Sequence, residues 1–336
     1  MSGKSSVRAT LAVATLCLIL SACATSGGTG GKSLTVGFIN PTLTNPYFVG
    51  LQKGAQEGAK QYGFKLIKTN SNNDISTQYN QVIDMVNRQV DAIVVSPIDA
   101  KGIVPAIKRA NSAGIPVFTL DRGAAGGKVT SKVLIDNAKA GAKAANIIIG
   151  QLKQRYGSPQ GNVVDLQGLS GTDVANEREA GFQKALKKYP NIKVVANQAA
   201  DFDQEKAFNI TKNILQANPN IDAIFAANDD MAVGAERAIG SAGRFAPMGS
   251  KDHIVVVGID GSPQALTAIR SGKQDATVSQ NPISESKRCF ELINEKLVKK
   301  KSIPSTSVLP TMVITKKNID SQKVKSYGLW GEQVKP

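Results

Sequence analysis

The sequence has few of the residues that usually carry covalent or metal chemistry, with three cysteines and one histidine in 336 residues. We expect Cys17 and Cys23 to belong to an N-terminal signal, which leaves Cys289 alone in the folded part and allows no internal disulfide. His253 opens an expected strand, away from any recognisable catalytic motif. This scarcity argues against a cysteine nucleophile, and we expect no metal and no cofactor.

Long hydrophobic runs are also missing. The apolar run from Leu11 to Leu20 is far shorter than the ~20 residues of a membrane-spanning helix, which argues against a transmembrane anchor. It follows the basic residues Lys4 and Arg8 and leads into the small-residue sequence Leu-Ser-Ala-Cys, which ends at Cys23. This arrangement resembles the signal of a bacterial lipoprotein.

We therefore expect residues 1–23 to be a lipoprotein signal peptide with its lipobox, and Cys23 to carry the lipid. Residues 24–33 are rich in glycine and serine and have the composition of a flexible tether. The folded part is then extracytoplasmic, anchored on the periplasmic side or on the outer face of the cell membrane.

Acidic residues are scarce relative to basic ones, 26 against 41, which gives a net charge of +15. Such a balance can indicate binding to nucleic acid or to an anionic surface. Here the lysines are scattered over amphipathic helices, and the one dense run, Lys299 to Lys301, flanks a turn at Pro304. We interpret them as solvated faces and expect no nucleic-acid partner.

Short β-branched runs alternate with helical patterns along the chain, which favours βαβ units and an α/β fold with parallel sheets. The same tripeptide, Asp-Ala-Ile, begins an expected buried strand in each half, at Asp91 and at Asp222. We therefore predict two similar lobes; the alternative is that the repeated tripeptide is a coincidence. Strands are expected at 34–39, 65–68, 91–96, 116–120, 161–166, 193–196, 221–226 and 254–259, and helices at 48–62, 76–89, 102–113, 174–188, 204–217, 231–243 and 285–298.

Two of these strands are followed directly by an aspartate, Asp121 in the first half and Asp260 in the second. Ligands of open α/β sheets sit at the carboxyl ends of the strands. Two halves that each deliver a carboxylate there predict a cleft that closes on its ligand from both sides.

A set of short motifs then occurs in one order from about Leu34 to Thr311. It consists of Thr-Asn45-Pro-Tyr47-Phe48, Thr-Leu-Asp121-Arg122, Gly-Thr-Asp-Val-Ala-Asn-Glu-Arg178, Ala-Asp-Phe202-Asp, Ala-Asn228-Asp-Asp-Met, Gly-Ile-Asp260-Gly-Ser-Pro and Ser-Gln280-Asn-Pro. This set resembles the ribose-binding branch of the periplasmic sugar-binding protein family (type I).

The resemblance implies two doubly wound parallel-sheet lobes joined by a three-stranded hinge. The first lobe would comprise residues 34–135 and 281–309, and the second residues 136–280 and 310–336. It further implies a monomeric receptor that hands a sugar or polyol to the permease of an ABC importer and is not an enzyme.

By motif position, the resemblance assigns ligand contacts to both lobes. The residues are Asn45, Tyr47, Phe48, Asp121, Arg122, Arg178, Phe202, Asn228, Asp260 and Gln280. These residue types suit a sugar, because carboxylates accept from hydroxyl groups, guanidinium groups donate to them, and aromatic rings cover the apolar faces of the sugar ring. We expect the two arginines to balance the two aspartates and keep them ionised.

Each residue also has a simpler interpretation. Asp260 could cap the following helix, Asp121 and Arg122 could form only a local ion pair, and Phe48 could belong to the hydrophobic core. Pro41 and Tyr47 depart from the ribose-receptor pattern, which puts ribose itself in doubt. A ribose-like pentose is favoured, with another pentose or hexose, a polyol or an amino sugar as alternatives.

Other functional classes remain as rivals. The protein could be a sugar sensor linked to a chemoreceptor, or an extracellular glycosidase with Asp121 and Asp260 as its two carboxyl groups. A transcription regulator would need a DNA-binding helix-turn-helix before the core. The signal and tether occupy that place in this sequence.

Overall fold

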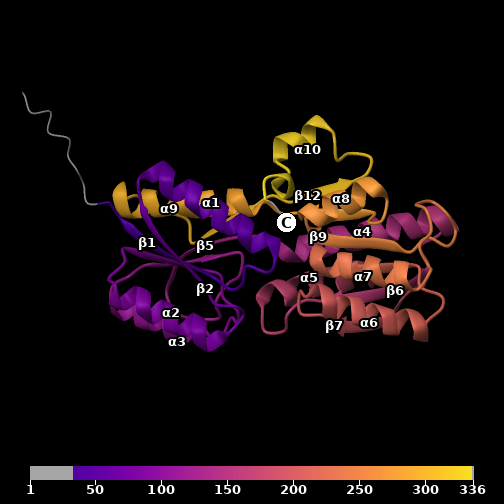
Figure 1. Ribbon diagram of the computed structural model, residues 1–336, viewed down its shortest axis with the longest axis horizontal. Coiled ribbons are helices and arrows are strands. Elements are labelled where there is room, and N and C mark those ends of the chain that lie inside the picture. Colours follow the sequence, from indigo (N-terminus) through magenta and orange to yellow (C-terminus); the bar gives the residue numbers. More distant parts are fainter. Residues whose placement is uncertain (1–32, 335–336) are drawn as a thin grey trace, which may run out of the picture. The chain divides into compact units, whose positions relative to one another are not determined.

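The computed structural model describes residues 33–334, which form two six-stranded sheets (Figure 1). The first sheet is parallel throughout and has the order β11-β5-β4-β3-β1-β2. Its strands are β1 (Thr35–Asn40), β2 (Lys65–Asn70), β3 (Ala92–Val95), β4 (Val117–Leu120), β5 (Val129–Ile135) and β11 (Thr306–Leu309).

The second sheet has the corresponding order β12-β10-β9-β8-β6-β7 and differs in one respect, because its edge strand β12 is antiparallel to β10. The other neighbours are parallel. The strands are β6 (Gly161–Gln167), β7 (Ile192–Ala199), β8 (Ala223–Ala226), β9 (Val255–Asp260), β10 (Ala276–Ser279) and β12 (Met312–Thr315).

Helices cover both faces of the first sheet. Figure 1 shows α1 (Pro46–Tyr62) and α9 (Pro282–Ile293) on one face and α2 (Ile75–Asn87) and α3 (Val104–Ser112) on the other. Side chains alternate along a strand, so β1 sends Phe38 into the core under α1 and α9 and Ile39 into the core under α2 and α3. This two-sided burial explains why the central strands β3 and β4 are almost wholly apolar, whereas the edge strand β2 keeps polar residues.

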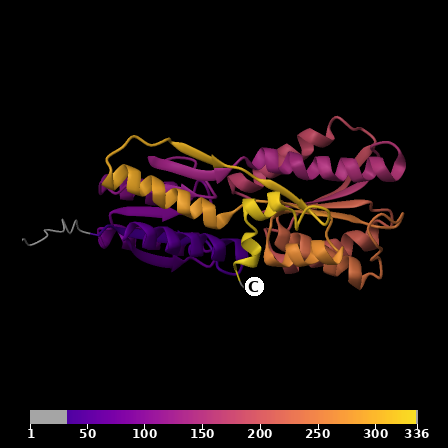
Figure 2. The same cartoon turned by 90° about the horizontal axis from the view of Figure 1, so that it is seen from above.

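The second sheet is covered in the same way. Figure 2 shows the magenta α4 on one side of its strands and the orange α7 and α8 on the other, while α5 packs on α4 and α6 on α7. These helices are α4 (Asn137–Tyr156), α5 (Asp173–Leu186), α6 (Gln204–Ala217), α7 (Asp229–Ser241) and α8 (Pro263–Ser271). The predicted α/β class with two doubly wound lobes is confirmed.

The chain passes between the two sheets three times, after β5, after β10 and between β11 and β12. Near its C-terminus, α10 (Gln322–Tyr327) places the Tyr327 hydroxyl so that it donates to the carbonyl oxygens of Ser279, at 2.8 Å, and Pro310, at 3.3 Å. One side chain therefore ties two of the passages together. Trp330, in a short 3-10 turn (Trp330–Glu332), then packs into the core of the first lobe.

Some elements differ from the sequence prediction. No strand was expected over β5 and no helix over α4, and α9 begins at Pro282 and continues after Ile293 as a π-helical turn, Asn294–Val298. The predicted signal, the lipid site Cys23 and tether residues 24–32 lie outside the described residues. Within residues 33–334, no helix is both long enough and apolar enough to cross a membrane.

A buried acidic pair lies in the second lobe, on β6 and α5. Asp165 is fully buried, and it accepts a hydrogen bond at 3.0 Å from the Gln183 amide. Burial and the neighbouring Glu179 raise the pKa of Asp165 to about 9. The carboxyl group therefore holds a proton in the folded protein at neutral pH.

Replacing Asp165 with asparagine is expected to make stability less dependent on pH. Because its folded-state pKa is raised, wild-type Asp165 contributes most stability below about pH 4, and that contribution is lost as pH rises toward about 9. The loss is at most about 1.4 kcal/mol per pH unit. Urea unfolding of Asp165→Asn across this range should give a flatter profile than wild type, whereas the exposed control Asp84→Asn should follow wild type. Parallel profiles for all three proteins would contradict the assignment.

Candidate functional site

The predicted ligand contacts all lie around one small cavity where the two lobes meet, with a volume of about 20 Å³. The structure thus brings together residues that are up to 235 positions apart in the sequence, from Asn45 to Gln280 (280 − 45 = 235). Val174, on α5, also lines the cavity and was not predicted. It sits within the motif ending at Arg178, but a single valine at a helix start carries no binding signal of its own.

Local structure explains how the first lobe presents its residues. Asn45 caps α1, its side chain accepting from the backbone N–H of Tyr47 at 2.8 Å, and Pro46 occupies the first helical turn. Tyr47 and Phe48 follow in that turn, at the start of the first helix after β1. Asp121 comes immediately after β4, so the side chains meet at the carboxyl edge of the sheet.

The second lobe presents its residues at the same edge. Asn228 follows β8 and caps α7 by accepting from the N–H of Met231 at 3.0 Å. Asp260 ends β9, and Gln280 directly follows β10. The Gln280 amide donates to Asp260 Oδ1 at 2.7 Å, which links the second lobe's carboxylate to one of the passages between lobes.

Each aspartate has a guanidinium partner. Arg122 Nε lies 3.7 Å from Asp121 Oδ2, and Arg178 Nη1 lies 3.5 Å from Asp260 Oδ1, with all four side chains buried. Arg178 is held by further bonds, donating to the Ala227 carbonyl at 2.7 Å and to Asn137 Oδ1 at 3.0 Å. The pairs hold opposite charges side by side in a space closed to water.

Burial outweighs these pairings in setting the protonation equilibria. Removal from water raises the pKa of both Asp121 and Asp260, although Arg122 and Arg178 act in the opposite direction. Burial likewise lowers the pKa of Arg122. The arginines thus act in the expected direction, toward ionised aspartates, but they do not offset burial, because desolvation of a carboxylate costs more than one imperfectly aligned ion pair returns.

Aromatic rings enclose the charged groups. The Arg122 guanidinium lies 5.1 Å from the ring centroid of Phe48 and 5.6 Å from that of Phe202, and Arg178 lies 6.0 Å from Phe202. Tyr47 packs edge-on against Phe48. A planar cation between aromatic faces keeps its donors in one plane, ready for a hydroxyl pair.

The backbone at the site is held in conformations that side chains rarely adopt. The φ angles are 66° at Asp121, 60° at Phe202 and 133° at Asp260. Such angles cost about 1–3 kcal/mol each and persist where the surroundings impose them. At Asp260 the surroundings are visible, since the indole N–H of Trp330 donates to its carbonyl oxygen at 2.7 Å.

The simpler interpretations are only partly correct. Phe48 does belong to the first-lobe core, and Asp121 and Arg122 do form a local pair, yet both also line the cavity. The capping role belongs to Ser262, which accepts from the N–H of Ala265 at 3.2 Å. Asp260 is thereby left to face the cavity.

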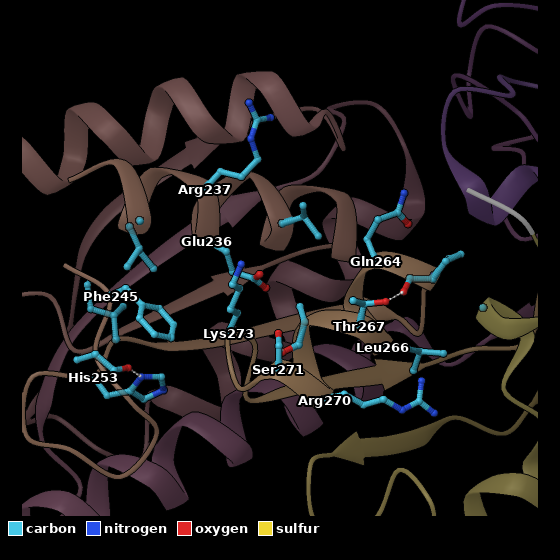
Figure 3. A pocket seen from close by; sticks show the side chains of 18 of the residues that line it. Glu236, Arg237, Phe245, His253, Gln264, Leu266, Thr267, Arg270, Ser271 and Lys273 are labelled. Carbon is cyan, nitrogen blue, oxygen red and sulfur yellow. Dashed lines mark hydrogen bonds between the residues drawn. The ribbon is translucent and has the colours of Figure 1, made fainter. Parts of the chain in front are cut away.

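A second, much larger cavity of about 730 Å³ lies in the second lobe between α7 and α8 (Figure 3). Figure 3 shows Phe245 and His253 at one end and Leu266 and Arg270 at the other. Its walls are largely apolar, and none of the predicted ligand contacts line it. Arg270 at its rim already bonds Glu332. Polar side chains such as Glu236, Thr267 and Lys273 also line this cavity, but they stand among mainly apolar walls, whereas charged and amide side chains make up most of the lining of the small cavity.

Comparison with known proteins adds an independent finding. The family model for the periplasmic binding protein domain matches residues 36–301. The chain is 38% identical over 286 residues to the ribose import binding protein RbsB of Bacillus subtilis, covering 85% of this chain and 88% of that protein. It is 33% identical over 270 residues to the xylitol-binding protein of Mycolicibacterium smegmatis, covering 80% and 74%.

A solved structure gives the same result for the fold. The periplasmic solute-binding protein of an ABC transporter from Actinobacillus succinogenes, crystallised with bound D-allose, matches with a TM-score of 0.76 and 34% identity. The match covers 85% of this chain and 98% of that one. It thus spans both sheets and the passages between them.

Proposed function

The chain belongs to the periplasmic binding protein family, and from this premise we infer that it captures a monosaccharide outside the cytoplasm and delivers it to an ABC importer. The observation that carries this inference is the paired set of buried charges, Asp121 with Arg122 and Asp260 with Arg178, at the carboxyl edges of both sheets. Four charged groups that face one another across the lobes offer acceptors and donors to hydroxyl groups on every side of a small ring.

We propose that the ligand is a ribose-like pentose, bound by the residues that line the small cavity. The relatives include binding proteins for ribose, D-allose and xylitol, so the same framework serves pentoses, hexoses and polyols. Pro41 has no side-chain donor, and Tyr47 adds a hydroxyl. Another pentose or hexose, a polyol or an amino sugar is therefore the alternative, since a selective site strongly penalises one missing partner.

Capture requires the lobes to move. The cavity of about 20 Å³ is far below the roughly 300–1,000 Å³ of common small-molecule sites, so a ring enters only when the space widens. Bonds across the cleft hold this arrangement closed, from the N–H of Gly123 to Asp173 Oδ2 at 2.8 Å and from the N–H of Ala100 to the Gly171 carbonyl at 3.3 Å. We propose that residues 34–135 with 281–309 and residues 136–280 with 310–336 open and close as lobes, and that sugar shifts the population toward closure.

We further propose that the mature protein is a monomer tethered through a lipid on Cys23. The support is the sequence Leu-Ser-Ala-Cys after a short apolar run. A sensor role with a chemoreceptor, beside or instead of transport, is compatible with the same binding site.

The related proteins are receptors rather than enzymes, and we propose the same here. Incubation with pentosides should therefore release no products, and turnover would favour the glycosidase alternative.

A thermal-shift screen against pentoses, hexoses, pentitols and amino sugars tests the proposed function. A true ligand at about 100 times its dissociation constant stabilises the folded state by about 2.7 kcal/mol. We expect the largest upward shift from a pentose, and no shift from disaccharides, because a second ring would keep the lobes from closing. A screen in which no sugar or polyol raises the melting temperature would contradict monosaccharide capture.

A further inference from the structure

A third buried carboxyl group lies behind the candidate site. Glu285 is in the first turn of α9, just after the chain returns to the first lobe, and its side chain is 0% exposed. Among the described residues, neither of its carboxyl oxygens has a hydrogen-bond partner. A buried acceptor without a partner costs about 1–3 kcal/mol, and more when it is charged. Its position therefore calls for an explanation.

The side chain of Glu285 interacts with the hydroxyl of Tyr47, on α1. This hydroxyl is buried and makes no well-aligned hydrogen bond within residues 33–334. Its interaction lowers the pKa of both Glu285 and Asp121, against the larger effect of burial, so the hydroxyl is close to both carboxyl groups. Two groups with unmet hydrogen-bonding capacity, Glu285 and Tyr47, thus lie beside Asp121 at the ligand cavity.

The charged and titratable groups around Glu285 come from every neighbouring element. They are Tyr47 on α1, Asp121 after β4, Arg178 on α5, Asp260 at the end of β9 and Tyr327 on α10. None of the ion pairs found in the described part of the chain includes Glu285, and the two guanidinium groups already face Asp121 and Asp260. An ionised Glu285 would add an uncompensated negative charge to a site closed to water, which is strongly unfavourable.

We propose that Glu285 is protonated and donates a hydrogen bond to the oxygen of Tyr47. The hydroxyl of Tyr47 in turn donates a hydrogen bond to Asp121. A neutral carboxyl group has one donor and a phenol has one donor and one acceptor, so this direction gives each of the three groups a hydrogen bond with the one proton that Glu285 holds. Glu285 is then a positioning residue rather than a ligand contact.

The consequence for recognition concerns Asp121. With Tyr47 donating on one side and the Arg122 guanidinium in ion-pair contact at 3.7 Å on the other, the remaining lone pairs of Asp121 are left to face the cavity as acceptors. This inference rests on the proposed function, because the acceptors matter only if a sugar binds there. It also explains why a tyrosine at position 47 is accompanied by an acid that would otherwise be unpaired in the core.

The test combines variants at both ends of the Glu285 to Tyr47 contact, with the sugar found in the thermal-shift screen as probe. Glu285→Gln retains a donor and is expected to bind within about threefold of wild type. Glu285→Met fills the space without a donor and is expected to weaken binding about 10-fold or more, the effect of one lost buried hydrogen bond. In the double variant Tyr47→Phe/Glu285→Met, the second change should cost less than it does alone, because its partner is already gone.

Two readouts separate positioning from a merely structural role. Wild-type affinity should fall as pH rises through the raised pKa of Glu285, and this limb should be absent in Glu285→Gln. The infrared carbonyl band of a protonated carboxyl group should be present in the sugar-free wild-type protein and reduced in Glu285→Gln, which is a result independent of any sugar.

Failure of wild type to bind any sugar would contradict the proposed function alone. Equal affinities for Glu285→Gln and Glu285→Met, or an unchanged infrared band, would overturn this inference while leaving sugar capture intact.

Discussion

Asp260→Asn is expected to weaken sugar binding by about 2–5 kcal/mol, between about 30-fold and several thousand-fold, while leaving the unliganded fold near wild type. The substitution keeps the shape of the side chain, and asparagine tolerates unusual φ angles such as the 133° at this position better than alanine does. It removes the charge that faces Arg178 and turns one of the two acceptor oxygens into a donor, so that the amide cannot both accept from Gln280, now at 2.7 Å, and offer a second acceptor to a sugar. A sugar hydroxyl would then meet a neutral amide, and the Arg178 guanidinium would have lost its carboxylate.

The same substitution elsewhere provides the comparison. Asp121→Asn should weaken binding by a similar factor, because the first lobe depends on its own buried pair with Arg122. Asp201→Asn is the matched control, since Asp201 also has a positive φ, 55°, and pairs with a cation, Lys206 at 2.8 Å, but lies outside the small cavity. It should bind within about twofold of wild type. Titration calorimetry that gave Asp260→Asn and Asp201→Asn equal affinities would show that recognition does not pass through Asp260.

Most of the site could be predicted from sequence because its residues lie at places that local rules mark. Asp121 and Asp260 follow apolar strands, and Asn45 and Asn228 are helix caps next to recognisable turns. These places converge at one edge of a parallel sheet, so they can be predicted without knowing the structure of the loops between them. An ordered set of short motifs fixed the remaining residues by resemblance, including Phe202.

The sequence could not predict Glu285, and the reason is physical. An acid in the first turn of an amphipathic helix is normally a solvated residue that interacts with the helix dipole. Here α9 is covered on one side by α1 and on another by the C-terminal segment that carries Trp330, so the polar side of its first turn is buried too. That burial depends on a contact between residues far apart in the sequence, which periodicity within one helix cannot reveal.

The pairing of the last strand was missed for a related reason. β12 is short, and its antiparallel pairing with β10 depends on the chain arriving from β11 in the other sheet rather than through a helix. The return of Trp330 to the first-lobe core is equally nonlocal. These features place the backbone carbonyl of Asp260 under an indole N–H, so they contribute to the site although they lie outside every predicted motif.

Asp229→Ala is expected to destabilise the protein by about 3–5 kcal/mol, more than any surface substitution. The Asp229 carboxylate is fully buried at the start of α7 and accepts four hydrogen bonds. The donors are the N–H of Gly261 at 2.7 Å, the N–H of Ser262 at 2.9 Å, the Thr277 hydroxyl at 3.0 Å and the Gln274 amide at 3.1 Å. Alanine would leave these donors without their acceptor and would free the turn that directly follows Asp260.

The neighbouring acid offers a matched contrast. Asp230 is adjacent in sequence, but burial and Asp229 raise its pKa to about 7, so its ionisation opposes folding as pH rises from about 4 to 7. Asp230→Asn should therefore be at least as stable as wild type at about pH 8, where Asp229→Ala shows its full loss. Urea unfolding followed by the fluorescence of the single tryptophan, Trp330, measures both.

Because Asp229 orients the turn after Asp260, Asp229→Ala should also lose affinity for sugar under conditions where it remains folded. Equal stability of the two variants at this pH would mean that the carboxylate of Asp229 does not hold the turn.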